Sequence, residues 1–159
     1  MSDLLRGKTA VVTGASSGNG RAIARTFAEH GADIVVADIR EEPRLGGTPT
    51  HEIIPEETDV SASFVPCDVT SNDDLRAAVT EADEYGGIDV MVNNAGIFAD
   101  TESLFAVTED EYGTMMDINA KGPFFGSQFA AEKMRESGGG NVINLSSING
   151  DVGTESNVA

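Results

Sequence analysis

The sequence predicts an α/β fold in which a doubly wound parallel sheet is covered by helices on both faces. Short runs of β-branched residues alternate along the chain with segments of helical periodicity, which is the pattern of βαβ units. The 159 residues are enough for one hydrophobic core and too few for two ordinary domains. We therefore expect one domain over residues 1–159.

The first predicted helix lies between two apolar runs. Residues 8–13 and 33–38 are rich in valine, as expected of strands that are buried on both faces. Residues 18–30 repeat apolar side chains at helical spacing, and Gly31 is a suitable stop for that helix. Together they predict a first strand–helix–strand unit.

Residues 40–62 interrupt this alternation with more proline, glycine and charge than their surroundings. A short helix is expected at 51–54, interrupted by Pro55, because proline lacks the N–H that an inner helical turn needs. We expect a surface excursion on the same domain, since the strands on either side are needed in one sheet.

The second half of the chain predicts three strands and two helices. The expected strands cover 63–68, 88–93 and 141–145. Ser71 is expected to cap a helix that ends near residue 84, with acidic residues in its first turn. Thr108 is expected to cap a longer helix that ends before the glycines at 138–140.

Composition excludes several classes of partner. Asp and Glu number 27 against 10 Lys and Arg, and the formal charge of −17 would repel nucleic-acid phosphates and anionic membranes. No stretch approaches the roughly 20 apolar residues of a transmembrane helix, and the N-terminus lacks a secretory signal pattern. The single Cys67 excludes an internal disulfide and a cysteine metal cluster. We expect a cytoplasmic protein without metal.

The acidity itself has two explanations. One is a solvated acidic surface adapted to high salt, where screening removes the self-repulsion, and the other is an ordinary acidic protein. The acidic residues are spread along the chain and form no tail, which favours salt adaptation and a halophilic source.

The strongest local motif is a glycine-rich turn directly after the first strand and at the start of the first helix. Glycines permit a tight turn and close approach of the backbone, and the helix N-terminus offers N–H groups and partial positive charge to a diphosphate. A plain turn is the alternative. The candidate coenzyme-binding residues here are Gly14, Ser16, Ser17, Gly18, Asn19 and Gly20.

Asp38 strengthens the nucleotide interpretation. It ends the second strand, roughly 20 residues beyond the glycines, where a carboxylate can accept hydrogen bonds from the adenosine ribose. Its charge would repel the 2′-phosphate of NADP, and Ser17 offers that phosphate no positive charge. Arg40 could offer one but lies beyond Asp38. NAD is therefore preferred over NADP, with an ordinary strand-end residue as the alternative for Asp38.

Further motifs follow the glycine run in a fixed order: Cys67-Asp68-Val69-Thr70, Asn93-Asn94-Ala95-Gly96, Asn119, and Asn144-Leu145-Ser146-Ser147. In this order the chain resembles the short-chain dehydrogenase/reductase family over essentially its whole length. The resemblance implies a Rossmann fold with strand order 3-2-1-4-5. It also implies hydride transfer between a nicotinamide coenzyme and a small alcohol or ketone, such as a sugar, a secondary alcohol or an oxoacyl compound, in a dimer or tetramer.

The same resemblance implies roles for further residues. Asp68 by its side chain and Val69 by its backbone should hold the adenine. Asn94, Ala95 and Gly96 should line the ribose and brace the sheet. Asn19 stands where family members usually have an aliphatic residue, but the expected contact is a backbone N–H, which asparagine also has.

Two residues are the catalytic candidates. Pro123 has no N–H, so the carbonyl of Asn119 loses its ordinary helical donor and can hold a water, which the family uses in its proton relay. Ser147 matches the serine that binds the reacting oxygen of the substrate. For Ser146 a structural role and a functional role both stay open.

The family's acid/base, a tyrosine followed one helical turn later by a lysine, would fall just beyond Ala159. Tyr85 and Tyr112 cannot replace it, because Asp89 and Met116 stand where the lysine is needed. We expect a C-terminally truncated, inactive chain that lacks strands 6 and 7, with its fifth strand as an open edge.

The alternative function is a truncated nucleotide-binding module without catalysis. Apolar residues on the long helix are expected to be core or interface and no part of a cofactor pocket; they are Met115, Ile118, Phe125 and Phe129.

Overall fold

The computed structural model describes residues 3–98 and 104–147 and forms a parallel five-stranded sheet in the order β3-β2-β1-β4-β5. The strands are β1 (Thr9–Thr13), β2 (Asp33–Asp38), β3 (Ala62–Pro66), β4 (Val90–Asn93) and β5 (Asn141–Asn144). In the central register Val11 of β1 lies opposite Val35 of β2 and Met91 of β4. The predicted fold class and strand order are confirmed.

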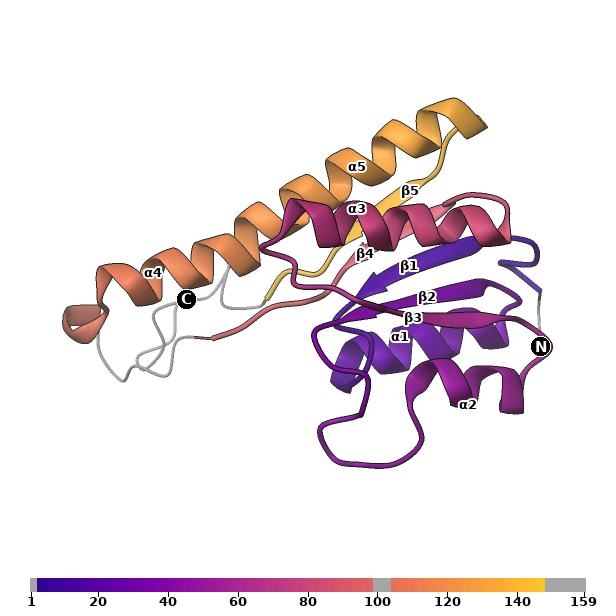
Figure 1. The fold of residues 1–159 in the computed structure, drawn as a ribbon, viewed down its shortest axis with the longest axis horizontal. Helices are drawn as coiled ribbons and strands as arrows, with labels where there is room; N and C mark the ends of the chain where they lie inside the picture. The colour runs from indigo at the N-terminus through magenta and orange to yellow at the C-terminus, as the bar shows by residue number, and fades with distance from the viewer. Residues whose placement is uncertain (1–2, 99–103, 148–159) are drawn as a thin grey trace.

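Helices cover both faces of this sheet (Figure 1). The α-helices are α1 (Gly18–Glu29), α2 (Thr50–Glu57), α3 (Asn72–Glu81), α4 (Glu109–Met116) and α5 (Gly122–Ser137). Shorter turns are the 3₁₀ segments η1 (Ala82–Tyr85) and η2 (Leu104–Ala106) and the π segment η3 (Asp117–Lys121). Helices α1 and α2 lie on one face, and α3 and α5 lie on the other.

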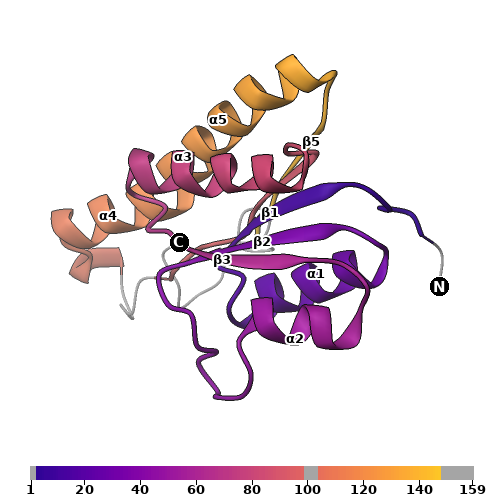
Figure 2. The same cartoon turned by 45° about the vertical axis from the view of Figure 1, so that its right-hand side comes forward.

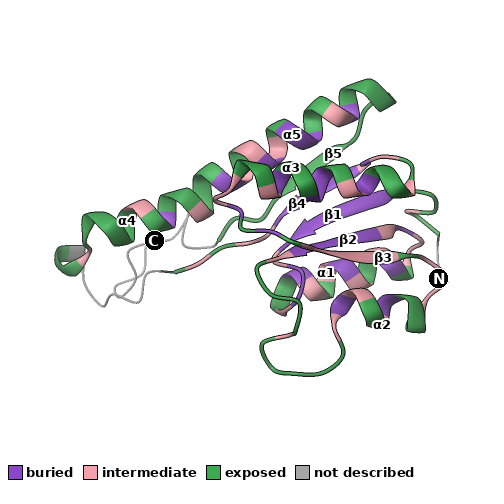
Figure 3. Ribbon diagram, in the orientation of Figure 1, coloured by how far each residue is buried: buried purple, intermediate pink, exposed green. Residues whose placement is uncertain are grey.

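Alternating side chains of the strands supply a core to each face. Val11 and Val35 point toward α3 and α5, where Leu75 and Phe129 are buried with them. The next residues along these strands, such as Val36, point to the opposite face and pack with α1 and α2. The central strands are therefore buried on both sides, as Figure 3 shows.

The segment between β2 and β3 differs from its prediction. Helix α2 continues through Pro55 to Glu57, so the proline does not interrupt it. Thr50 and Ile54 of this helix are buried, Ile54 at 1% exposure in the core beneath the sheet. Packing of these two residues holds the helix despite the one hydrogen bond that Pro55 cannot make. The excursion is thus a core element and not only a surface loop.

The long helix predicted from Thr108 to about residue 136 forms with a local change of winding. Thr108 and Glu111 make a reciprocal capping box, which lowers the pKa of the Glu111 carboxyl, and Gly138 ends the helix in the left-handed conformation. Between α4 and α5 the Gly122 N–H donates to the Asp117 carbonyl, the i→i−5 bond of a π turn. Figure 2 shows α4 extending beyond the sheet on this continuous axis.

The predicted open edge is present in the described residues, since β5 pairs only with β4 and all four of its residues are exposed. On the long helix Phe129 and Met115 are buried. None of the helices in the described part combines the length and apolar character needed to cross a bilayer.

Candidate functional site

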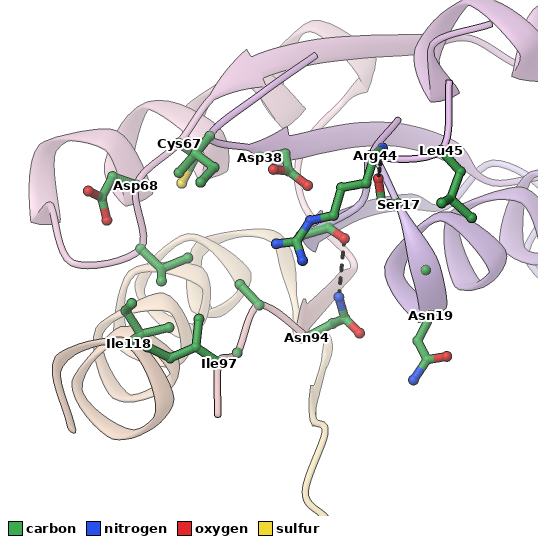
Figure 4. A pocket seen from close by; sticks show the side chains of 16 residues that line it. Ser17, Asn19, Asp38, Arg44, Leu45, Cys67, Asp68, Asn94, Ile97 and Ile118 are labelled. Carbon is green, nitrogen blue, oxygen red and sulfur yellow. Dashed lines mark hydrogen bonds between the residues drawn. The ribbon is translucent and has the colours of Figure 1, made fainter. Parts of the chain in front are cut away.

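A pocket of about 540 Å³ opens at the carboxyl ends of the central strands. The chain leaves β1 toward β2 on one side and returns to β4 on the other, so this is the crevice where parallel α/β sheets bind ligands. Figure 4 shows the side chains that surround it. The lining residues are Gly14, Ser17, Gly18, Asn19, Asp38, Ile39, Arg44, Leu45, Cys67, Asp68, Val69, Asn94, Ala95, Gly96, Ile97 and Ile118.

The glycine-rich turn forms one wall of the pocket. Gly14 (φ 66°) and Gly18 (φ 54°) have left-handed backbones that favour glycine. A Cβ on Gly20 would lie 2.2 Å from the Gly14 carbonyl oxygen and 2.5 Å from Asn94 Nδ2. Gly20 is therefore required by the packing of the turn on its neighbours, and it lies outside the pocket lining.

The N-terminus of α1 faces this turn without a side-chain cap. Ser17 occupies the cap position with an extended backbone but makes no capping hydrogen bond. Its Oγ instead accepts from the backbone N–H of Arg44 at 2.8 Å. The first N–H groups of α1 thus receive no protein cap from Ser17, which suits an anion at the helix end.

Ser16 lies behind the pocket and not in it. It is fully buried, and its Oγ has no hydrogen-bond partner among the described residues. Its backbone N–H donates to Asp38 Oδ2 at 3.0 Å. This contact helps to orient Asp38, and the predicted contact of Ser16 with a coenzyme stays a prediction.

The carboxylate of Asp38 lines the pocket in a fixed orientation. Oδ2 accepts from Ser16 N–H, and Oδ1 accepts from Arg40 N–H at 3.3 Å. Each carboxylate oxygen can accept more than one hydrogen bond, so acceptor capacity toward the pocket remains. The structure therefore brings Asp38 to the glycine turn, as expected from the sequence.

Asp68 and Val69 lie at the other end of the same pocket. Asp68 Oδ1 accepts from Thr70 N–H at 2.9 Å and Thr70 Oγ–H at 2.8 Å, so the start of this loop is ordered by its own side chain. Cys67 precedes it and is 3% exposed. Burial, followed by the charges of Asp74, Asp68 and Asp38, raises the pKa of the Cys67 thiol to about 12.

Asn94 braces the site from β4. Its Nδ2 donates to the Thr13 carbonyl at 2.8 Å and to the Gly14 carbonyl at 3.3 Å. The backbone N–H groups of Asn94 and Ala95 both donate to Thr13 Oγ1, at 3.0 and 3.1 Å. These bonds tie the ends of β1 and β4 together, so Asn94, Ala95 and Gly96 reach the pocket from a rigid edge.

Asn119 contacts the pocket wall through its side chain. Its Oδ1 accepts from Ile97 N–H at 2.9 Å and its Nδ2 donates to the Ile97 carbonyl at 2.8 Å. No sequence motif predicts these two hydrogen bonds, which fix the segment after β4 to the π turn η3. The neighbouring Ile118 packs against the core on the α3 and α5 face, as expected, and it also lines the pocket, which was not expected.

Ser147 follows β5 and is exposed, outside the residues that line the pocket. Ser146 is also exposed and outside the lining. The structure therefore brings together the glycine turn, Asp38, Asp68 and the segment at 94–96, but it does not place Ser147 with them.

Arg44 is a pocket residue that the sequence does not predict. It lines the pocket from the loop between β2 and α2. Along the chain Arg40 is the cation nearer to Asp38, and Arg44 lies farther on. The hydrogen bond from the Arg44 N–H to Ser17 Oγ brings the loop to the glycine turn, and no local sequence pattern indicates it. Within residues 3–98 and 104–147, no three His, Cys, Asp or Glu side chains gather in a way that could hold a metal ion.

The parallel sheet, the glycine turn and the crevice together define a Rossmann-type α/β protein. The family model described as short chain dehydrogenase matches residues 8–159, and the chain belongs to that family. It is 41% identical over 152 residues to zerumbone synthase of Zingiber zerumbet, a match that covers 91% of this chain and 53% of the relative. It is 38% identical over 151 residues to a 3-oxoacyl-acyl-carrier-protein reductase of Chlamydia muridarum, covering 94% and 59%.

A solved structure, a short-chain type dehydrogenase/reductase from Mycobacterium marinum, superimposes with a TM-score of 0.83 at 32% identity. The match covers 97% of this chain and 63% of that one. This chain therefore spans between about half and two thirds of the length of these relatives.

Proposed function

We propose that this chain is the coenzyme-binding part of an NAD-dependent oxidoreductase that transfers hydride between the nicotinamide and a small alcohol or ketone. The observation that carries the proposal is the meeting of the glycine turn, the N-terminus of α1 and Asp38 in one pocket. Membership of the short chain dehydrogenase family supports the same chemistry. Residues 1–159 would form a single dinucleotide-binding domain.

The groups that line the pocket fit a dinucleotide. The first turn of α1 can receive the diphosphate, because Ser17 leaves its N–H groups without a side-chain cap. Asp38 can accept hydrogen bonds from the adenosine ribose. Asp68 and Val69 line the same pocket and would hold the adenine. Ala95 and Gly96 present little side chain and would allow the nicotinamide ribose to approach.

When bound, the coenzyme supplies the hydride acceptor or donor. Asn119 would hold the relay water with its main-chain carbonyl, since Pro123 has no N–H to donate to it. Its side-chain clamp on Ile97 fixes that carbonyl relative to the pocket. Ser147 would orient the reacting oxygen of the substrate by hydrogen bonding.

The substrate is proposed only as a class. One relative is named a synthase of zerumbone and another a reductase of 3-oxoacyl groups, and a sugar, secondary alcohol or oxoacyl compound would each suit the proposed chemistry. We further propose a cytoplasmic protein with a small-molecule substrate and no nucleic-acid or membrane partner, which assembles as a dimer or tetramer when full length.

Asp38→Ala tests the coenzyme preference. In calorimetric titrations at molar salt, the wild-type chain should bind NAD more tightly than NADP, since the carboxylate accepts from the ribose and repels a 2′-phosphate. The variant should bring the two dissociation constants closer together. Asp73→Ala removes the same charge from an exposed position of α3 outside the pocket and should leave the ratio unchanged. An unaltered ratio in Asp38→Ala would contradict the assigned role.

The absence of a tyrosine followed one helical turn later by a lysine favours a second function for the 159 residues alone, a nucleotide-binding module without turnover. Formation of NADH should be undetectable with sugars or secondary alcohols while NAD binding persists. Measurable turnover would show that another group takes the proton, and would reject this second function.

A further inference from the structure

Arg44 lies on a loop that is fastened to the glycine turn. The backbone N–H of Gly46 donates to the Pro43 carbonyl at 2.9 Å, so Arg44 and Leu45 occupy the tip of a β-turn. The backbone N–H of Arg44 then donates to Ser17 Oγ at 2.8 Å. These two bonds fix the start of the Arg44 side chain beside the first turn of α1.

The far end of the loop is anchored as well. Thr50 Oγ1 is buried, donates to the Ala15 carbonyl at 2.9 Å and accepts from Arg21 Nη1 at 3.1 Å. Thus the loop is tied to the glycine turn at Ser17 and, through the start of α2, at Ala15. Its position over the turn is built in and does not depend on a bound ligand.

The Arg44 side chain extends from this anchor into the pocket. Figure 4 shows its guanidinium over the glycine turn, in that view between Asp38 on one side and Asn94 on the other. Under the proposed function, Asp38 binds the adenosine ribose, and Asn94 lies near the nicotinamide ribose. The group midway between the two riboses of a dinucleotide is its diphosphate.

The positive charge of Arg44 is not paired with a carboxylate among the described residues. Six of the ten lysines and arginines form ion pairs with carboxylates, but the Arg44 guanidinium has no ion pair or hydrogen bond within residues 3–98 and 104–147. It is the only lysine or arginine among the residues that line the pocket, where Asp38 and Asp68 supply negative charge. A diphosphate that binds between Asp38 and Asn94 would therefore meet one cationic side chain of the pocket lining, Arg44.

We propose that Arg44 binds the diphosphate of the dinucleotide from the loop between β2 and α2, which already lies over the glycine turn. This inference rests on the proposed function. A guanidinium presents paired N–H donors to phosphate oxygens, and charge-assisted bonds of this kind are stronger than those of neutral donors. The helix N-terminus binds the diphosphate from below, and Arg44 binds it from the loop.

Arg44→Gln tests this role, with Arg135→Gln, on the exposed side of α5, as a control of equal charge change. Titrations with NAD, NADP and ADP-ribose give the dissociation constants. Loss of one charge-assisted contact should weaken all three by about tenfold, while Arg135→Gln should bind as wild type does. Arg44→Lys should recover part of the loss, and circular dichroism should show the same fold in each variant.

Different results separate the possible errors. If Arg44→Gln weakens NADP alone, the guanidinium serves the 2′-phosphate, and the diphosphate assignment is overturned. If Arg44→Gln binds NAD as tightly as wild type, Arg44 takes no part, and the proposed function still stands. If the wild-type chain binds neither dinucleotide nor ADP-ribose, the proposed function fails and this inference fails with it.

Discussion

Cys67 is the residue whose chemistry the site alters most. Cys67 follows β3 and is 3% exposed, and the charges of Asp74, Asp68 and Asp38 act on its thiol. Burial first, and then these charges, raise its pKa from 9.0 to about 12. Because the folded state holds this proton more tightly, the stability that the thiol contributes is present below pH 9 and is lost as pH rises toward 12.

The same shift predicts an inert thiol. The thiolate is the reactive form, and near pH 8 its fraction should be roughly a thousandfold lower than in a thiol with the unshifted pKa. An aromatic disulfide reagent should therefore react much more slowly with the folded chain than with the chain in urea, and saturating NAD should slow the reaction further. A folded-state rate equal to the rate in urea would show that Cys67 is accessible and ionised.

Residue roles were predictable where they depend on position in a strand or a turn. Asp38 and Asp68 could be placed from the sequence because Asp38 ends one recognisable strand and Asp68 follows another, and parallel strands end at the same edge. The clamp of Asn119 on Ile97 and the approach of Arg44 to Ser17 could not be placed. Each joins segments more than twenty residues apart through a loop whose path has no periodicity to read.

At the scale of elements, the long helix depends on where its glycines lie. A Cβ on Gly126 of α5 would lie 2.5 Å from Asn93 Oδ1 and 3.0 Å from Met91 Cε. The Asn93 amide is buried and donates to the Pro123 carbonyl, Ser127 Oγ and Asn144 Oδ1. Gly126 therefore permits the close approach at which β4, α5 and β5 share one polar network.

Gly126→Ala should destabilise the fold by about 1–3 kcal/mol, the usual cost of overpacking a site that cannot yield. Gly113→Ala on α4 is the matched control, because its added Cβ meets nothing within 4 Å. That variant should gain about 0.5–1 kcal/mol from better helix propensity. Urea unfolding followed by circular dichroism gives both values, and equal effects of the two substitutions would contradict the packing argument.

The elements themselves were mostly predictable because each carries its own start or stop signal. Ser71 and Thr108 cap α3 and α4 as expected, and Gly138 ends α5. The continuation of α2 through Pro55 was not predictable, since it depends on burial of Ile54 under the sheet. In α2 the packing of Ile54 outweighs the tendency of Pro55 to end a helix.

At the scale of the whole molecule, the number of negative charges far exceeds the number that ion pairs neutralise. The formal charge is −17, and every Lys or Arg ion pair in the described residues has both side chains partly exposed. Exposed pairs contribute little each and are screened by salt. The larger electrostatic effect is therefore the mutual repulsion of unpaired carboxylates, which opposes the compact state.

Salt should consequently stabilise this protein. The screening length falls from about 10 Å at 0.1 M to about 3 Å at 1 M. Added salt therefore removes the repulsion between separate carboxylates, and the only attraction lost with it is that of a few weak ion pairs. The midpoint of urea unfolding should rise steadily as NaCl or KCl is raised from 0.1 M to 2 M. Sucrose at matched osmolality serves as an uncharged control and should give a smaller rise if screening is the cause. A midpoint that falls with either salt would mean that the ion pairs, such as Lys8 with Asp89 across β1 and β4, outweigh the repulsion, and would remove the physical basis for salt adaptation.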